Sequence, residues 1–130
     1  MERNMAQGVI TKTGREKLCR AHAGDIILPA VTQMAFGSGG VDGDGAVIAA
    51  TGEEVSLRAE LLKKDIDSHT YPGEATARYS VRLGKVELAG EQISEMGLVD
   101  AEGDLVAYKT FLPKGKDGDM EFVFDMDEIF

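Results

Sequence analysis

Residues that build disulfide scaffolds and membrane spans are scarce in this sequence. The single cysteine, Cys19, cannot form an intramolecular disulfide, which is typical of a protein made in a reducing compartment. No apolar run approaches the roughly 18 residues of a transmembrane helix, and the first residues lack the apolar core of a signal peptide. Only 3 prolines accompany 16 glycines, so the chain turns often without being a low-complexity linker. We therefore expect a protein that is made in the cytoplasm and binds no membrane.

Basic residues are also in the minority, with 14 lysines and arginines against 23 acidic residues and a formal net charge of −9. This average field repels a nucleic-acid backbone, and no local cluster of basic residues offers an exception. The charge is unevenly spread, because residues 1–24 hold five basic residues whereas residues 117–130 hold six acidic residues and no basic one. Nucleic-acid binding is therefore not expected.

The length of 130 residues suits one domain, which can bury roughly two-thirds of its unfolded surface. Three segments stand out within it. We expect residues 1–8 to form a flexible arm, residues 37–50 a mobile glycine-rich loop, and residues 117–130 an acidic C-terminal strand and tail.

A short helix is predicted near the N-terminus. Thr13 and Glu16 have the spacing of a capping box, in which each side chain satisfies the other residue's backbone N–H. Gly24 is suited to end the helix in a left-handed conformation. Leu18 and Cys19 fall on its narrow apolar side, so a helix this short is expected to pack on a sheet.

Most of the remaining chain is predicted to be β-structure. Strands are expected over residues 30–36, 77–83 and 120–126, and a short helix running into a strand over residues 51–64. Residues 69–74 contain Pro-Gly and are expected to turn. This order predicts an α+β fold, in which an antiparallel β-meander sheet carries the short N-terminal helix packed on it.

The strongest local pattern is a β-hairpin over residues 93–111. Two β-like runs flank residues 100–104, where Asp100 is suited to open a turn and Gly103 to adopt a positive φ. Glu95 and Asp100 differ by five positions, so they are expected on opposite faces of the strand rather than as paired catalytic carboxylates.

The glycine-rich loop contains no complete ligand-binding motif. It lacks the terminal Gly-Lys-Ser/Thr of a phosphate-binding loop, and Asp42 and Asp44 supply only two of the ligands that a calcium loop needs. Its glycines are therefore expected to permit positive φ and nothing more.

Other candidate chemistry is equally sparse. Asp125, Asp127 and Glu128 are expected to form a solvated acidic tail rather than a metal site. His22 and His69 are expected at the core edge or on the surface, and Cys19 has no assignable base. We therefore expect no enzyme activity, no cofactor and no metal.

The segment from Ser94 to Tyr108 resembles the "R/S-E-I/M-G-L-x-D-x-x-G-x-L-I/V-A" segment of the phage tail-collar fibre family, found in N-terminal domains of tail fibres and baseplate-associated prophage tail proteins. Residues 10–14, 31–39 and 57–60 are weaker echoes of the family in the same order. The residues that carry the motif are Glu95, Gly97, Leu98, Asp100, Gly103, Leu105 and Ala107.

This resemblance implies a virion structural role. The implied properties are trimeric assembly, attachment to other tail or baseplate proteins, and a location in the host cytoplasm followed by the virion tail. Tail fibres continue into a long shaft, whereas this chain ends at Phe130. Either the chain is a reduced tail component or another polypeptide supplies the shaft.

The last predicted strand supplies a candidate contact face. Met120, Phe122, Phe124 and Met126 share one side of it and are expected to be buried against a helix or a neighbouring subunit. The alternative function is a small carbohydrate- or ligand-binding β module that uses the loop at residues 37–45.

Overall fold

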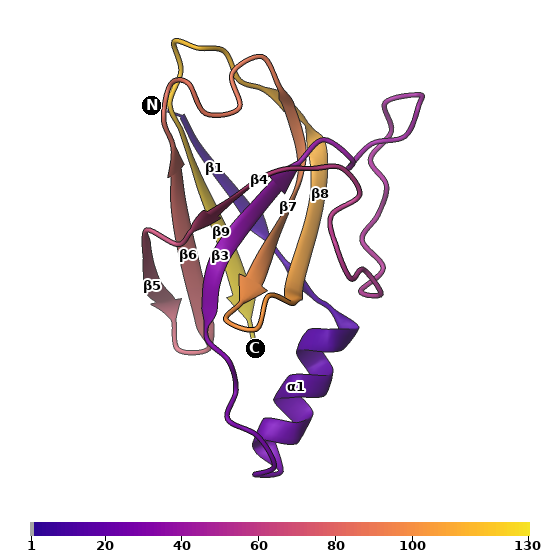
Figure 1. Ribbon diagram of the computed structural model, residues 1–130, viewed down its shortest axis with the longest axis vertical. Helices are drawn as coiled ribbons and strands as arrows, with labels where there is room; N and C mark the ends of the chain where they lie inside the picture. Colours follow the sequence, from indigo (N-terminus) through magenta and orange to yellow (C-terminus); the bar gives the residue numbers. More distant parts are fainter. Residues whose placement is uncertain (1) are drawn as a thin grey trace.

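The computed structural model describes the backbone of residues 2–130 and the side chains from Gly8 onward. Two β-sheets pack face to face, and a short helix lies at their lower end (Figure 1). The elements in chain order are β1 (Glu2–Gln7), β2 (Val9–Ile10), α1 (Lys12–His22), β3 (Val31–Gly37), β4 (Glu60–Asp65), β5 (Ser68–Gly73), β6 (Thr76–Leu83), β7 (Gln92–Asp100), β8 (Leu105–Gly115) and β9 (Phe122–Ile129). The α+β class, mainly β with a short N-terminal helix, is confirmed. Among the described residues, no helix is long and apolar enough to span a membrane.

The strands are divided between a five-stranded sheet in the order β2-β8-β7-β3-β4 and a four-stranded sheet in the order β1-β9-β6-β5. The five-stranded sheet is antiparallel throughout. In the four-stranded sheet β5, β6 and β9 are antiparallel, and β1 pairs parallel with β9. The chain thus forms a two-layer sandwich instead of one continuous meander.

Both sides of the sandwich are closed by chain that passes from one sheet to the other. Between β1 and β2, the Gly8 N–H donates to the Asp127 carbonyl of β9 at 3.0 Å. A Cβ at Gly8 would lie 2.5 Å from the Met126 methyl group. Between β4 and β5, the Ile66 N–H donates to a β3 carbonyl and the Asp67 N–H to a β6 carbonyl, both at 3.0 Å. Two short crossings therefore leave little open sheet edge at the corners.

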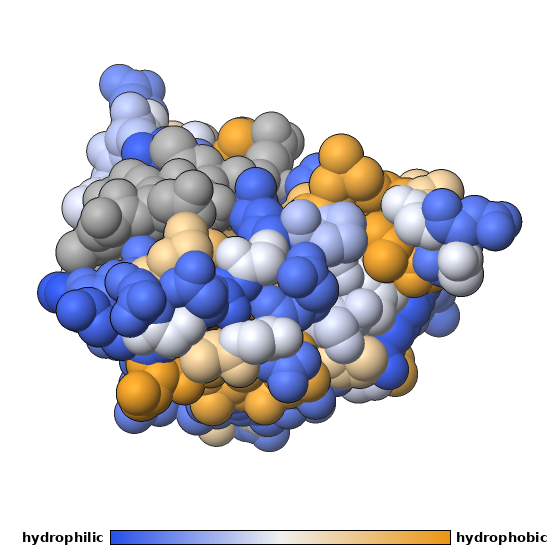
Figure 2. All heavy atoms as spheres, turned by 90° about the horizontal axis from the view of Figure 1, so that it is seen from above, coloured by the Kyte–Doolittle hydropathy of each residue, from blue (hydrophilic) through white to orange (hydrophobic). Residues whose placement is uncertain are grey.

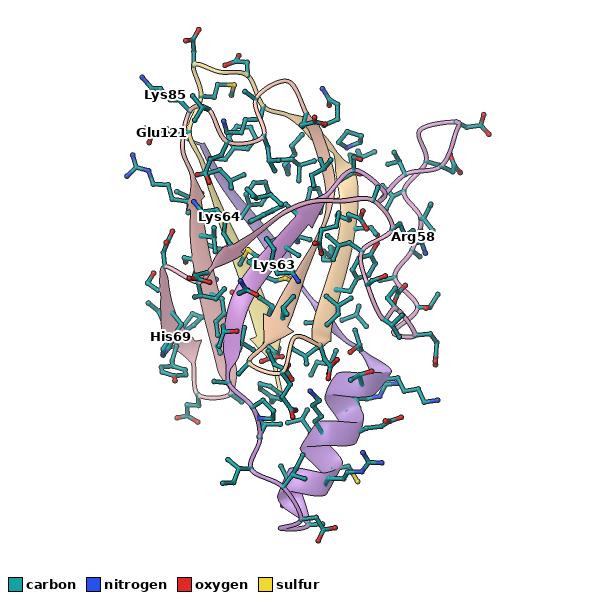
Figure 3. All side chains as sticks on the ribbon, in the orientation of Figure 1. Arg58, Lys63, Lys64, His69, Lys85 and Glu121 are labelled. Carbon is teal, nitrogen blue, oxygen red and sulfur yellow. The ribbon has the colours of Figure 1, made fainter. Side chains whose placement is uncertain are left out.

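A side-chain contact strengthens the second crossing. Lys64 of β4, labelled in Figure 3, donates at 2.8 Å to both Glu87 Oε1 and the Arg82 carbonyl. The hydrogen bond from Lys64 and that from the Gly84 N–H lower the pKa of Glu87. This contact joins the edge of the five-stranded sheet to the β6–β7 connection of the other layer.

Aliphatic and aromatic side chains from both sheets meet in the core. Phe36 of β3 and Phe124 of β9 have ring centroids 5.0 Å apart, and Phe122 lies 5.9 Å from Phe124. The prediction that this row of β9 contacts another subunit is wrong. Phe122, Phe124 and Met126 are at most 1% exposed, and Met120 packs against the same cluster. The second sheet, which the sequence pattern did not reveal, covers this row within the chain.

Helix α1 begins earlier than the sequence predicted. Thr11 is the N-cap: its Oγ1 accepts from the Gly14 N–H at 3.1 Å and donates to the Leu105 carbonyl at 2.8 Å. The predicted Thr13–Glu16 capping box is therefore wrong, since the buried Thr11 is fixed by β8. Gly24 follows the helix with a φ of +86°, as expected.

The helix contacts the sheet over a small area. A Cβ at Gly14 would lie 2.6 Å from the Val106 carbonyl oxygen, so this glycine permits the close approach of α1 to β8. Cys19 is exposed, which corrects its expected place on the packed side. The helix sits beyond the end of the strands in Figure 1 and covers only part of the five-stranded sheet.

Three segments differ from expectation. Residues 2–7 form β1 rather than a flexible arm, and Met1 lies outside the described residues. Residues 51–59 are irregular and β4 begins at Glu60, so the short helix predicted there does not form. The solvated acidic tail is also wrong: Asp125 is 0% and Glu128 8% exposed, because both lie in β9 and not beyond it.

The hairpin and its turn are confirmed. Strands β7 and β8 pair antiparallel, the Gly103 N–H donates to the Asp100 carbonyl at 2.9 Å, and Gly103 has a φ of +86°. The segment predicted to turn at residues 69–74 is mostly strand β5, with the turn at residues 74–75.

Replacing Gly103 by Val should lower the free energy of unfolding by about 1 kcal/mol or more, because a β-branched residue disfavours positive φ. Space is not the cause, since a Cβ at Gly103 meets nothing within 4 Å. Urea denaturation measures the change. Gly43→Val is the matched control, because Gly43 has equally open surroundings without positive φ. Equal stability of the two variants would contradict the role assigned to the Gly103 backbone.

Candidate functional site

The motif residue Glu95 is a fully buried carboxylate at 0% exposure in β7. Its Oε2 accepts from the Gly39 and Ala59 N–H groups and its Oε1 from the Arg58 N–H, all at 2.8 Å. The Tyr108 hydroxyl of β8 donates to Oε1 at 2.7 Å. Four donors therefore compensate the lost hydration of this charge.

The Glu95 cluster (Glu95, Tyr108 and the N–H groups of Gly39, Arg58 and Ala59) joins both ends of the β3–β4 connection to the sheet. Gly39 lies at the start of this connection, just after β3, and Arg58, labelled in Figure 3, lies at its end, just before β4. Burial, followed by the hydrogen bond to Glu95, raises the pKa of Tyr108, so its hydroxyl stays protonated and donating. The cluster has a structural role, and no Glu95 oxygen is exposed to bind a substrate.

Glycines make room for this cluster. A Cβ at Gly37 would lie 2.5 Å from Glu95 Oε2, and one at Gly39 would lie 2.7 Å from the same atom. A Cβ at Gly40 would lie 1.8 Å from the Ser94 carbonyl oxygen. None of the three has positive φ, so the expectation that they serve only backbone freedom is wrong: they are needed for space.

The same loop is anchored at both ends. Ser94 Oγ accepts from the Gly40 N–H at 2.9 Å, and Thr110 Oγ1 donates to the Ile48 carbonyl at 2.7 Å. At its tip Asp42 Oδ1 accepts from the N–H groups of Asp44 and Ala46 at 2.8 and 3.0 Å. The loop that we expected to be mobile is thus anchored at its base. At its tip, Asp42 Oδ1 accepts hydrogen bonds from the backbone of the same loop.

Asp100 organises the hairpin turn and binds the helix. Its Oδ1 accepts from the N–H groups of Glu102 and Asp104 at 3.0 and 3.1 Å. Lys17 Nζ of α1 lies 2.6 Å from Asp100 Oδ2, 2.9 Å from Glu102 Oε1 and 2.7 Å from Asp104 Oδ2. The three carboxylates have the spacing of a cation site, and the lysine ammonium sits against all three.

Lys17 is held in its charged form by this cluster. Burial acts to lower its pKa, but the hydrogen bonds to Asp100, Asp104 and Glu102 outweigh burial and raise it. Three carboxylates around one ammonium leave an excess of two formal negative charges within this cluster. Sequence reasoning missed the cluster because Lys17 and Asp100 are 83 positions apart.

The other motif residues serve packing. A Cβ at Gly97 would lie 2.4 Å from Leu105 Cδ1, which explains the glycine by close packing. Leu98 and Ala107 are 0% exposed and Leu105 is 4% exposed. The structure thus brings all seven motif residues into one hairpin, and Asp100 among them also lines a cavity.

A cavity of about 260 Å³ lies beside the motif hairpin, between α1, the segment that enters β3, and the ends of β6 and β9. Its polar lining residues are the Lys17–Asp100 pair from α1 and β7, Tyr79 from β6 and Glu128 from β9. The lining residues are Ile10, Gly14, Lys17, Leu18, Leu28, Pro29, Ala30, Val31, Tyr79, Asp100, Val106, Glu128 and Phe130. No sequence pattern pointed to it, because its walls come from distant parts of the chain.

Glu128 is the buried acid of this cavity. Burial raises its pKa, and a hydrogen bond with Tyr79 acts in the opposite direction. Burial and the nearby Glu128 charge raise the pKa of Tyr79 to about 12, so the phenol remains a donor at neutral pH. The pair is the second cluster that sequence reasoning missed.

The remaining candidates do not gather into a site. On the other face of β9, Asp125 accepts from Ser80 Oγ at 2.5 Å, and Asp127 pairs with the Arg78 guanidinium at 2.8 and 3.0 Å. Both histidines are exposed, and His69 lies on β5 in Figure 3.

Comparisons with known proteins identified no relative: no protein-family model matches the chain, and neither a curated protein nor a solved structure matches it.

Replacing Glu95 by Gln should lower the free energy of unfolding by about 2–4 kcal/mol, because an amide NH₂ would face backbone donors. Tyr108→Phe should cost about 1–2 kcal/mol, since it removes one donor only. Urea denaturation measures both. Glu53→Gln is the control for loss of one charge on an exposed side chain. A Glu95→Gln variant as stable as this control would contradict the cluster.

Glu128 should make stability depend on pH. Its pKa in the folded state is raised above the ordinary 4.5, so the folded protein binds the proton more tightly than the unfolded chain does. Its contribution is most favourable below that ordinary pKa and falls as the pH rises through the folded pKa. Glu128→Gln removes this fall, so the stability of the variant relative to the unmodified protein should increase with pH in urea titrations. A difference that does not change with pH would contradict the assignment.

Proposed function

We propose that this chain is a non-catalytic structural protein of a phage or prophage tail, acting in tail-fibre or baseplate attachment and assembly. The proposal starts from the resemblance of residues 94–108 to the tail-collar fibre segment. Its partners are other tail or baseplate proteins and further copies of the chain, and its final location is the virion tail.

The main support for a non-catalytic role is that both carboxylates of the motif are bound by other groups of the chain. Glu95 is enclosed by four donors, and Asp100 is bound by its own turn and by Lys17. Both therefore support the framework instead of facing a substrate. A motif whose charged residues maintain the fold is compatible with a non-catalytic module.

An exposed apolar surface supports the same role. Ile26, Ile27 and Leu28 between α1 and β3 are 38%, 94% and 45% exposed, and Phe130 is 61% exposed. Leu28 and Phe130 both line the cavity, so these side chains are neighbours at the lower end. We call residues 26–28 and Phe130 the lower apolar surface. Contiguous apolar side chains of this kind are typical of subunit contacts.

The opposite end has a different character. Figure 2 shows hydrophilic residues across the middle of the upper end, with hydrophobic areas at its margins. The ligand-binding alternative at residues 37–45 gains no support, because Asp42 caps its own turn there. The lower apolar surface is therefore our candidate for the assembly contact.

Ile27→Asp should abolish self-association and binding to tail proteins encoded beside this chain, while leaving thermal stability unchanged because Ile27 is 94% exposed. Size-exclusion chromatography with light scattering measures the mass, and co-purification measures partner binding. Val55→Asp is the matched control, since Val55 is 78% exposed on another part of the surface. A strict monomer at high concentration that binds no tail protein would refute the proposed function.

A further inference from the structure

The cavity at the lower end holds a buried carboxylate with few partners. Glu128 is 8% exposed and lines the cavity. Among the described residues, its hydrogen-bond partner is the Tyr79 hydroxyl. A carboxylate has about four acceptor positions, so one phenol leaves most of them without a donor. By contrast, Glu95, which is 0% exposed, receives four donors.

The charges around the cavity favour a cation. Lys17 is the cationic side chain among the lining residues, but its ammonium is bound by three carboxylates at 2.6–2.9 Å. Its positive charge therefore offsets the carboxylates of the hairpin turn and not the charge of Glu128. The excess negative charge of that cluster adds to the Glu128 charge, and an anion entering the cavity would be repelled.

The other lining side chains are mostly apolar, and the cavity is small. Ile10, Leu18, Leu28, Val31, Val106 and Phe130 surround the space. Its volume of about 260 Å³ lies below the roughly 300 Å³ at which pockets for drug-sized ligands begin. A short alkyl chain fits this lining, and its far end would reach solvent past the exposed side of Phe130.

We propose that this cavity is a binding site for a primary alkylammonium group, with the ammonium on Glu128 and the alkyl chain among the aliphatic side chains. The ammonium supplies three donors to the carboxylate. The Tyr79 hydroxyl, which burial keeps protonated, holds the other side of the carboxylate in place. A free amine and the side chain of a lysine on another chain share this chemistry. The site does not depend on the proposed role in tail assembly.

The test compares three probes of equal chain length on the full chain: n-pentylamine, 1-pentanol and pentanoate. At about pH 7 the amine carries its proton. In NMR titrations, pentylammonium should shift the amide signals of cavity residues and saturate. Pentanol and pentanoate should bind at least about tenfold more weakly, because they lack the charge that pairs with Glu128. Equal binding of the alcohol and the amine would overturn the proposal.

Two variants distinguish the effect of the Glu128 charge on binding from the effect of the space in the cavity. Glu128→Gln should weaken pentylammonium binding at least about tenfold, whereas Glu91→Gln, an equal charge change at an exposed position, should not. Ala30→Leu should weaken all three probes by occupying the rim. Unchanged amine affinity in Glu128→Gln would overturn the proposal. If that variant does not fold, the comparison of amine and alcohol on the unmodified chain decides.

A last comparison identifies the source of the group. Blocked tripeptides with a central lysine or a central methionine are titrated in the same way. Binding of the lysine peptide alone would support the site and assign it to a lysine of another chain. Binding of pentylammonium without the lysine peptide would support the site and assign it to free amines. Absence of binding by both ammonium probes would overturn it.

Discussion

The buried charge of Glu95 is the interaction on which the five-stranded sheet depends. Removing a carboxylate from water costs several kcal/mol unless donors replace its hydration. Three backbone N–H groups and the Tyr108 hydroxyl replace it, and they bring the loops around β3 and β4 to the β7–β8 hairpin. Gly37 and Gly39 are required because a side chain there would displace the carboxylate. One acidic side chain therefore holds both ends of the β3–β4 connection.

The two ends of the sandwich are built differently. Its long sides are closed by the crossings at Gly8 and Ile66, and its interior is filled from both sheets. At the lower end α1 approaches β8 closely at Gly14, and Lys17 binds the hairpin turn. The space left between helix and sheet is the cavity, and the lower apolar surface adjoins it. Because of this separation, contacts made at the lower end would leave the core undisturbed.

Local sequence patterns predicted the secondary-structure elements better than they predicted which other parts of the chain each element contacts. The alternation around Phe122 and Phe124 correctly indicated a strand, yet it does not say which surface covers the apolar row. The second sheet covers it, so a face expected to contact another subunit became core. Glu95 presents the same difficulty: it was assigned to the strand pattern, but its donors at Gly39 and Arg58 are 56 and 37 positions away. The Tyr79–Glu128 pair lies outside any local motif.

The sequence by itself determined the α+β class, the hairpin at residues 93–111, and the positive φ of Gly103 and of Gly24 just after α1. These features depend on backbone preferences that act within a few residues. Only the tertiary structure decided that Glu95, Asp100 and Glu128 are buried, and that Lys17 pairs with the hairpin turn. The physical reason is that the burial of a charge depends on donors and apolar side chains brought together by long-range packing, which neighbours in the sequence do not specify.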